Sequence, residues 1–201
     1  MYKMMNLPYS YNELEPDIWT EIVDIHYNKH HKKYFDNLIY FLNKENFDYN
    51  YPLEDLSKNI NHFPLLSRGN ILYNVGGVLN HNLYFLSLNK NQSLPTGKLL
   101  KKINTQWGSV SNFIKSFNER ARLLVGSGYT FLAANTTDDL LILNMINQET
   151  PYTYNLLPLF NIDLWEHAYY LEYKNDRDSY INNFWNKANF QYASKKYEES
   201  F

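Results

Sequence analysis

Cysteine is absent from this chain of 201 residues. Its absence excludes disulfide bonds, thiolate zinc sites, iron–sulfur clusters and cysteine nucleophiles. Histidine and the carboxylates of aspartate and glutamate are therefore the only strong metal ligands that the sequence offers.

The sequence also lacks long apolar runs and a surplus of basic residues. No stretch approaches the ~20 apolar residues of a membrane-spanning helix, and the first residues, MYKMMNLPYSYNELEP, contain no apolar core of signal-peptide length. The formal net charge of -2 provides no basic surface for nucleic acid or anionic lipid. We therefore expect a cytoplasmic protein that binds neither nucleic acid nor a membrane.

The common nucleotide and hydrolase motifs are missing as well. The sequence contains no G-x-G-x-x-G, no phosphate-binding Walker loop and no G-x-S-x-G. Their absence argues against nucleotide-dependent catalysis and against serine hydrolase chemistry.

The first half of the chain contains apolar residues with helical spacing. Hydrophobic residues make up 44% of the sequence, enough for a well-buried core. Long helices are predicted over 18–43 and 72–86, and a shorter one over 53–60. Two long helices with an irregular connection predict an antiparallel hairpin. The polar segment NKNQSLPTG then predicts a boundary between a helical hairpin domain at 1–89 and a second domain at 90–201.

The second half changes character. Helices are predicted over 99–103, over 109–124 with Ser109 as its cap, and over 176–187. The segments GYTFLAAN, LLILNMIN and LLPLFNIDL are short, apolar and bounded by turn residues, which is typical of strands. The predicted fold class is therefore α+β, with a long N-terminal antiparallel helical hairpin followed by a C-terminal α/β domain that contains a small, about three-stranded antiparallel sheet.

Six histidines provide the candidate chemistry. His26 and His30 stand four residues apart on a predicted helix, but the glutamate that a zinc protease needs beside the first histidine is missing. A set of three imidazoles and one carboxylate, which suits manganese, iron or zinc, is available in His26, His81, Asp163 and His167. A single buried histidine is more often structural, so spacing alone leaves the convergence of these four open.

Seven motifs in order along essentially the whole chain resemble those of the iron/manganese superoxide dismutases: LPYSYNELEP, DIHYNKHHKKYF, NVGGVLNHNLYF, INTQWGSVSNFIKSF, GSGYTFL, NQETP and DLWEHAYYLEY. The last is similar, nearly residue for residue, to the family signature D-x-W-E-H-A-Y-Y. The resemblance implies a superoxide dismutase that forms oxygen and hydrogen peroxide while its metal alternates between the trivalent and divalent states. It also implies one metal ion per subunit, with a solvent molecule as fifth ligand beside His26, His81, Asp163 and His167.

The resemblance implies roles for residues around the metal. Tyr34 and His30 match a gateway pair that lines the substrate funnel and relays protons. Gln148 matches the amide that hydrogen-bonds the metal-bound solvent and tunes it. Glu166 and Tyr170 match residues that reach across a two-fold interface, which implies a homodimer or a tetramer built from it.

Further positions are implied to support the site. Trp165, Gly77 and Tyr129 match residues of the shell around the ligands or of the dimer interface, and Arg177 matches an arginine that attracts the anionic substrate. Gly77 together with Gln148 follows the pattern of the manganese enzymes. Manganese is therefore the expected metal, and iron is the alternative.

Some positions depart from the family pattern. Tyr129, Phe131 and Phe85 stand where tryptophan is usual, and Asp178 replaces a proline beside Arg177. These changes alter volume and hydrogen bonding near the site and predict a turnover below the typical one. Two other hypotheses remain open: a structural relative that keeps the fold without useful turnover, and an iron oxygenase, which would need a large apolar cavity beside its metal.

Overall fold

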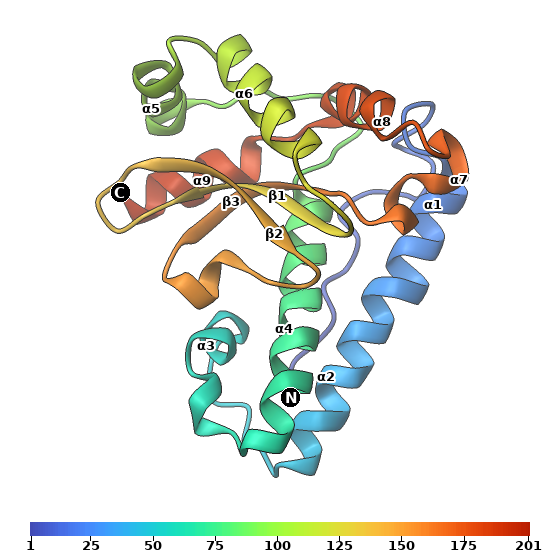
Figure 1. Cartoon of the computed structure of the whole chain (residues 1–201), viewed down its shortest axis with the longest axis vertical. Coiled ribbons are helices and arrows are strands. Elements are labelled where there is room, and N and C mark those ends of the chain that lie inside the picture. The colour runs from blue at the N-terminus through green and yellow to red at the C-terminus, as the bar shows by residue number, and fades with distance from the viewer.

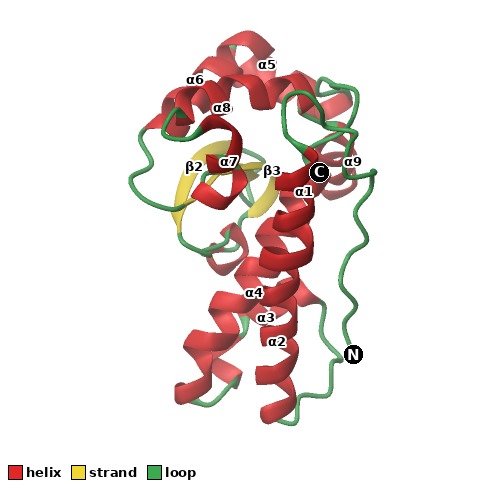
Figure 2. Ribbon diagram, turned by 90° about the vertical axis from the view of Figure 1, so that its right-hand side faces the viewer, coloured by secondary structure: helices red, strands yellow, loops and turns green.

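The computed structural model describes the whole chain, residues 1–201, as a long helical hairpin joined to a layer of sheet and shorter helices (Figures 1 and 2). The first arm of the hairpin is one continuous run of three helical segments, α1 (Thr20–Ile25), the π-helix η1 (His26–His31) and α2 (Lys32–Lys44). The second arm is α4 (Leu65–Leu86), and the connection between the arms contains α3 (Leu53–Lys58) and η2 (Ile60–His62). The predicted helical hairpin is confirmed, although α4 begins earlier than expected.

Aliphatic side chains hold the two arms together. Leu38 and Leu42 of α2 pack with Ile71, Val75 and Val78 of α4, and none of the five is more than 1% exposed. Burial of this size stabilises each side chain by roughly 1.5–3 kcal/mol relative to exposure. The packed hairpin therefore supports the residues at the end where its arms meet the sheet, among them His26 and His81.

The π-helical segment η1 changes which side chains face inward. Two residues five apart point in different directions on an α-helix, whereas the wider turn of a π-helix brings them closer to one face. His26 and His31 are both buried as a result, at 1% and 0% exposure. Single π-turns of this kind are frequent at functional sites.

A three-stranded antiparallel sheet of order β2-β1-β3 forms the centre of the C-terminal half, as predicted. Its strands are β1 (Gly128–Ala134), β2 (Leu140–Ile146) and β3 (Leu157–Asp163). β1 is buried along its whole length because it lies between the other two strands. Tyr129 of β1 pairs with Asp163 at the end of β3, and β3 packs against α4.

Helices surround this sheet (Figure 1). They are α5 (Gly97–Trp107), α6 (Val110–Arg122), η3 (Pro151–Tyr154), η4 (Glu166–Ala168), α7 (Tyr170–Tyr173), α8 (Arg177–Phe184), η5 (Trp185–Lys187) and α9 (Gln191–Ser200). α5 is longer than the predicted helix over 99–103, and α9 lies outside the predicted helices. Only Ala193, Ser194 and Tyr197 of α9 are buried, so its apolar pattern is weak. No helix of the fold combines the length and apolar composition needed to cross a bilayer.

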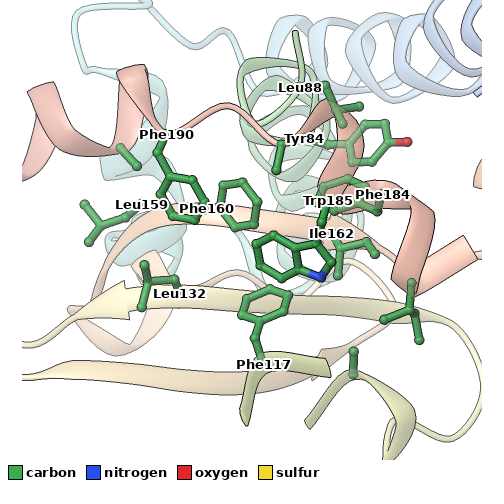
Figure 3. Close-up of a cluster of buried hydrophobic side chains, with 14 of the residues drawn as sticks. Tyr84, Leu88, Phe117, Leu132, Leu159, Phe160, Ile162, Phe184, Trp185 and Phe190 are labelled. Atoms are coloured by element: carbon green, nitrogen blue, oxygen red, sulfur yellow. The ribbon is translucent and has the colours of Figure 1, made fainter. Parts of the chain in front are cut away.

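An aromatic cluster fills the space between the sheet and the helices behind it (Figure 3). The rings of Phe160 and Phe190 stack at 4.5 Å, and Trp185 stacks on Phe160 at 5.7 Å. The indole N–H of Trp185 donates to Asn118 at 2.7 Å, which satisfies the one polar atom of that ring. This cluster fixes α8 and α9 against β3.

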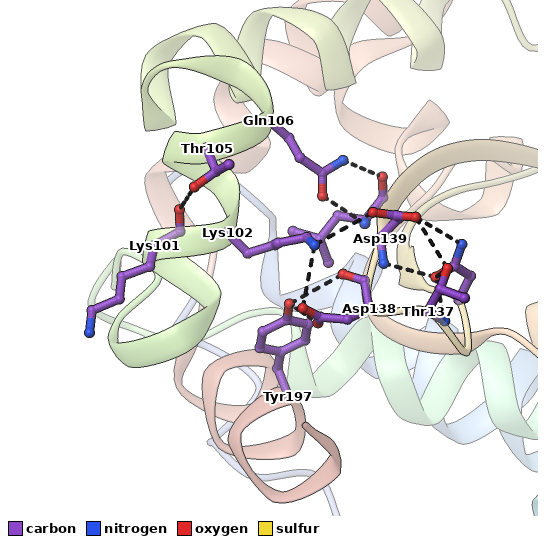
Figure 4. Close-up of polar contacts among 10 residues, drawn as sticks. Lys101, Lys102, Thr105, Gln106, Thr137, Asp138, Asp139 and Tyr197 are labelled. Carbon is purple, nitrogen blue, oxygen red and sulfur yellow. Dashed lines mark hydrogen bonds and ion pairs between the residues drawn. The ribbon is translucent and has the colours of Figure 1, made fainter.

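Polar contacts anchor the turn between β1 and β2 to the helices beside it (Figure 4). Lys102 of α5 lies 3.3 Å from Asp138 and 3.5 Å from Asp139, and the Gln106 amide bonds the backbone of Leu140 in both directions. The Tyr197 hydroxyl of α9 donates to the Asp138 carboxylate. Helices α5 and α9, from the beginning and the end of the C-terminal half, thereby both contact the turn between β1 and β2.

Candidate metal centre

Four side chains from distant parts of the chain meet where the hairpin joins the sheet. They are His26 of η1, His81 of α4, Asp163 at the end of β3 and His167 of η4, and their ligand atoms all lie within 4.8 Å of one another. The Nε2 atoms of His26, His81 and His167 lie 3.2, 3.8 and 3.4 Å from Asp163 Oδ2. All four atoms are buried and none has a hydrogen-bond partner. Since unpaired buried polar atoms are costly, this cage fits a metal ion.

The charge state of the cage also suits a cation. Burial lowers the pKa of His26 to about 4 and holds the pKa of His81 well below its usual range. Burial alone raises the pKa of Asp163, but the neighbouring His167 and His26 outweigh it and hold that pKa below its usual value. The neutral imidazoles of His26 and His81 and the ionised Asp163 carboxylate offer lone pairs and a negative charge, which suit a manganese or iron ion.

Hydrogen bonds behind the four side chains orient them. The Nδ1–H of His81 donates to the Gly77 carbonyl oxygen at 2.6 Å, which leaves Nε2 unprotonated and facing the cage. Asp163 Oδ1 accepts from the Trp165 backbone N–H at 2.8 Å, so only Oδ2 is free to bind a metal. The Trp165 indole N–H in turn donates to the Asn147 carbonyl oxygen at 3.1 Å.

Two glycines of α4 allow other parts of the site to approach the helix. A Cβ added at Gly76 would lie 1.9 Å from the Gln148 carbonyl oxygen, and a Cβ added at Gly77 would lie 2.5 Å from the Tyr34 ring. Any side chain at either position would push these groups away. The glycines therefore bring Tyr34 and Gln148 to the cage from elements remote in sequence.

Tyr34 and Gln148 contact each other beside the cage. Gln148 is 2% exposed, and its Nε2–H donates to the Tyr34 hydroxyl at 3.1 Å. Asn80 Nδ2 donates to the Glu149 carbonyl oxygen at 2.9 Å and thereby holds the loop that contains Gln148. Burial raises the pKa of Tyr34, so its phenol stays protonated at neutral pH and remains a proton donor.

A cavity of about 480 Å³ lies beside Tyr34 and His30. The His30 ring stacks on His167 at 4.1 Å, and burial lowers the His30 pKa to about 4. Lys33 and Tyr73 also line this cavity, although the sequence arguments did not select them. Lys33 stands three residues after His30, and residues three or four apart share a helix face, so this spacing could have indicated Lys33.

Comparisons with known proteins decide the family. The model of the iron/manganese superoxide dismutase alpha-hairpin domain matches residues 1–89, and that of the C-terminal domain matches residues 95–196. This chain belongs to the iron/manganese superoxide dismutase family. It is 35% identical to Superoxide dismutase [Mn] of Listeria innocua serovar 6a over 98% of each chain. It is 38% identical to Superoxide dismutase [Fe] of Bordetella pertussis over 95% of this chain and 96% of that protein.

The other residues that the resemblance to the iron/manganese superoxide dismutases implied differ in their surroundings. Tyr129 is fully buried, with its hydroxyl 3.4 Å from His81 Nδ1. Glu166 and Tyr170 are exposed near His167. Arg177 donates to the carbonyl oxygens of Leu124 at 2.5 Å and Gly126 at 3.3 Å, so its guanidinium is held by backbone rather than by the cage.

Proposed function

We propose that this protein is a superoxide dismutase, which converts superoxide to oxygen and hydrogen peroxide with manganese or iron. The cage of four buried ligand atoms without hydrogen-bond partners is the observation that carries the proposal. The manganese and iron enzymes among its relatives support both the activity and the metals.

The residues of the chain supply binding, orientation and protons. His26, His81, Asp163 and His167 would hold the metal ion, and the Asp163 carboxylate would offset part of its positive charge. When bound, the ion would supply the redox chemistry that the side chains of this protein lack. Peroxide formation consumes two protons, and the protonated Tyr34 hydroxyl lies between the cavity and Gln148, where it can pass them inward.

The lining of the cavity beside Tyr34 supports a small ionic substrate over an organic one. His30, Lys33, Asn37 and Asn74 contribute polar groups to it. An anion is attracted by Lys33, whereas an iron oxygenase would need an apolar pocket for its substrate. The attraction of superoxide by Arg177 stays a prediction, and Lys33 is a second candidate for the same role.

We propose manganese as the preferred metal, with iron as the alternative. Gly77 leaves the space that Tyr34 fills, and Gln148 supplies the buried amide from the loop after β2. The Gln148 Nε2–H donates to the Tyr34 hydroxyl, so the amide acts as a hydrogen-bond donor beside the four ligands. A stronger donor at this place changes the acidity and potential of the centre.

The chain is further proposed to act as a homodimer, alone or within a tetramer. The support is that Glu166 and Tyr170 are exposed beside a site residue, where a second subunit can meet them. Analytical ultracentrifugation of the protein and of Glu166→Ala tests this assembly. The domain boundary between 89 and 90, the cytoplasmic location and the absence of nucleic-acid and membrane partners also stay predictions.

The deciding experiment combines elemental analysis with a superoxide-consumption assay on one sample, before and after reloading with manganese or iron. We expect about one metal per chain and activity that follows manganese occupancy. His81→Ala should lose both, whereas His62→Ala, at an exposed histidine outside the cage, should keep both. Metal binding without superoxide consumption under either metal would refute the enzyme and leave the structural relative.

A further inference from the structure

A second cavity, of about 210 Å³, lies between α4, η3 and α9, and Thr150, two residues after Gln148, contributes to its lining. Apolar side chains form much of its wall, among them Leu79, Leu83, Leu86 and Phe131. For comparison, a cavity of about 150 Å³ is large enough to hold benzene. The space therefore suits a molecule of several non-hydrogen atoms with an aliphatic portion.

Two opposite charges face this cavity without forming an ion pair. Lys196 of α9 donates to the Tyr152 hydroxyl at 2.6 Å and lies 5.2 and 5.4 Å from the ring centres of Tyr152 and Tyr192. Glu54 of α3 lies on the same lining, and the Lys196 ammonium has no carboxylate within 4.0 Å. Burial lowers the pKa of Lys196 to about 8, and Glu54 opposes that shift. The Lys196 ammonium is therefore mostly charged at neutral pH, and neither it nor the Glu54 carboxylate has an opposite charge within 4.0 Å.

Polar atoms with no hydrogen-bond partner line the same cavity. Thr150 and Asn80 are each 1% exposed, and Thr150 Oγ1, Asn80 Oδ1 and Asn82 Oδ1 are buried without partners. Asn80 uses its own N–H to hold the Glu149 carbonyl, so its oxygen is free to accept. Groups of this kind are normally satisfied by water or by a ligand.

We infer that this cavity binds a free α-amino acid with an aliphatic side chain. The ammonium of such a ligand supplies three N–H donors, which match Glu54 and the oxygens of Asn80 and Asn82. Its carboxylate accepts from Lys196 and from the Thr150 hydroxyl. Its side chain covers the apolar wall. A simple anion would leave Glu54 and both amide oxygens without donors.

Isothermal titration of the metal-loaded protein with L-leucine tests this site. The matched probes are 4-methylpentanoate, which lacks the ammonium, and 3-methylbutylamine, which lacks the carboxylate. Lys196→Met and Glu54→Gln should each weaken leucine binding by about tenfold or more, because each removes a charged partner. Phe131→Trp should abolish it by filling the cavity. Lys195→Met is the control, because that lysine is 76% exposed on the same helix.

Leucine binding that Lys196→Met, Glu54→Gln and Phe131→Trp weaken, and that Lys195→Met leaves unchanged, supports the proposal. Equal binding of 4-methylpentanoate would show an anion site and overturn it. No binding of leucine, alanine or valine would show that the cavity holds water only, which also overturns it. Circular dichroism of each variant identifies a folding defect, and Phe131→Trp gives an answer even where Lys196→Met fails to fold.

Discussion

Three glycines on one helix should respond to alanine in three different ways. Gly69 of α4 has no atom within 4 Å of an added Cβ, Gly77 has the Tyr34 ring at 2.5 Å, and Gly76 has the Gln148 carbonyl oxygen at 1.9 Å. Alanine stabilises a helix interior by about 0.5–1 kcal/mol relative to glycine. Overpacking costs about 1–3 kcal/mol where a side chain must move. The sign of the net effect therefore depends on the neighbour.

The expected changes in unfolding free energy follow from these two terms. Gly69→Ala should gain about 0.5–1 kcal/mol. Gly77→Ala should lose about 0.5–2 kcal/mol, since the cost of displacing Tyr34 exceeds the gain in helix propensity. Gly76→Ala should lose more than about 3 kcal/mol, because the backbone at Gln148 has to move. For a chain of this length, 1 kcal/mol corresponds to a shift in Tm of about 2–4 °C.

Thermal unfolding at matched metal content measures this series. Repeating Gly77→Ala in a Tyr34→Ala background removes the ring and should relieve most of the loss, because only the Cβ of residue 34 then remains, at 3.0 Å from the added Cβ. In a Tyr34→Phe background the ring remains, so the loss should persist. Equal effects at Gly69 and Gly77, or no relief in the Tyr34→Ala background, would refute the packing argument.

Three other perturbations test separate parts of the structure. Tyr34→Phe leaves the Gln148 N–H unpaired, which should cost about 1–3 kcal/mol of stability. The same change removes the phenol that donates protons, so superoxide turnover should fall most at high pH, where protons are scarce. Stopped-flow measurement of turnover over a pH series checks this. Burial raises the pKa of Glu172 to about 7, so its contribution is fully present below the unfolded value near 4.5 and is lost as pH rises through 7. Glu172→Gln keeps an acceptor for the Trp19 N–H and should flatten this decline in urea titrations between those pH values. Removing the metal by chelation should lower Tm, and manganese should restore it in the natural protein but not in His81→Ala.

The sequence predicted the elements whose patterns are strong. The helical period of the hairpin and the short apolar strands each follow from burial on one or both faces, and both are present. α9 escaped prediction because it presents few apolar residues to the core. The π-helical turn at His26–His31 also has no signature in the spacing of apolar residues, because it depends on backbone geometry.

The candidate site could be predicted only through the motifs. Spacing placed His26 on a helix and Asp163 near the end of a strand, but nothing local indicates that two remote segments meet at 4.8 Å or closer. The prediction that these side chains meet came from the resemblance to the iron/manganese superoxide dismutases. It did not select Lys33 or Tyr73, whose place beside Tyr34 follows from the packing of α2 on α4. The cavity beside Lys196 could not be predicted from the sequence either, because α9, which was not predicted, contributes Tyr192 and Lys196 to its wall.

The four ligands of the metal cage are separated along the chain, and this separation sets the order in which the protein matures. His26 and His81 are synthesised before Asp163 and His167, which stand in the second half of the sequence. Nascent chains that stop before Asp163 should retain no manganese in elemental analysis, because two imidazoles alone make a weak site. The complete site, and with it any preference for manganese over iron, can therefore exist only after Asp163 and His167 have been synthesised and have folded against the hairpin.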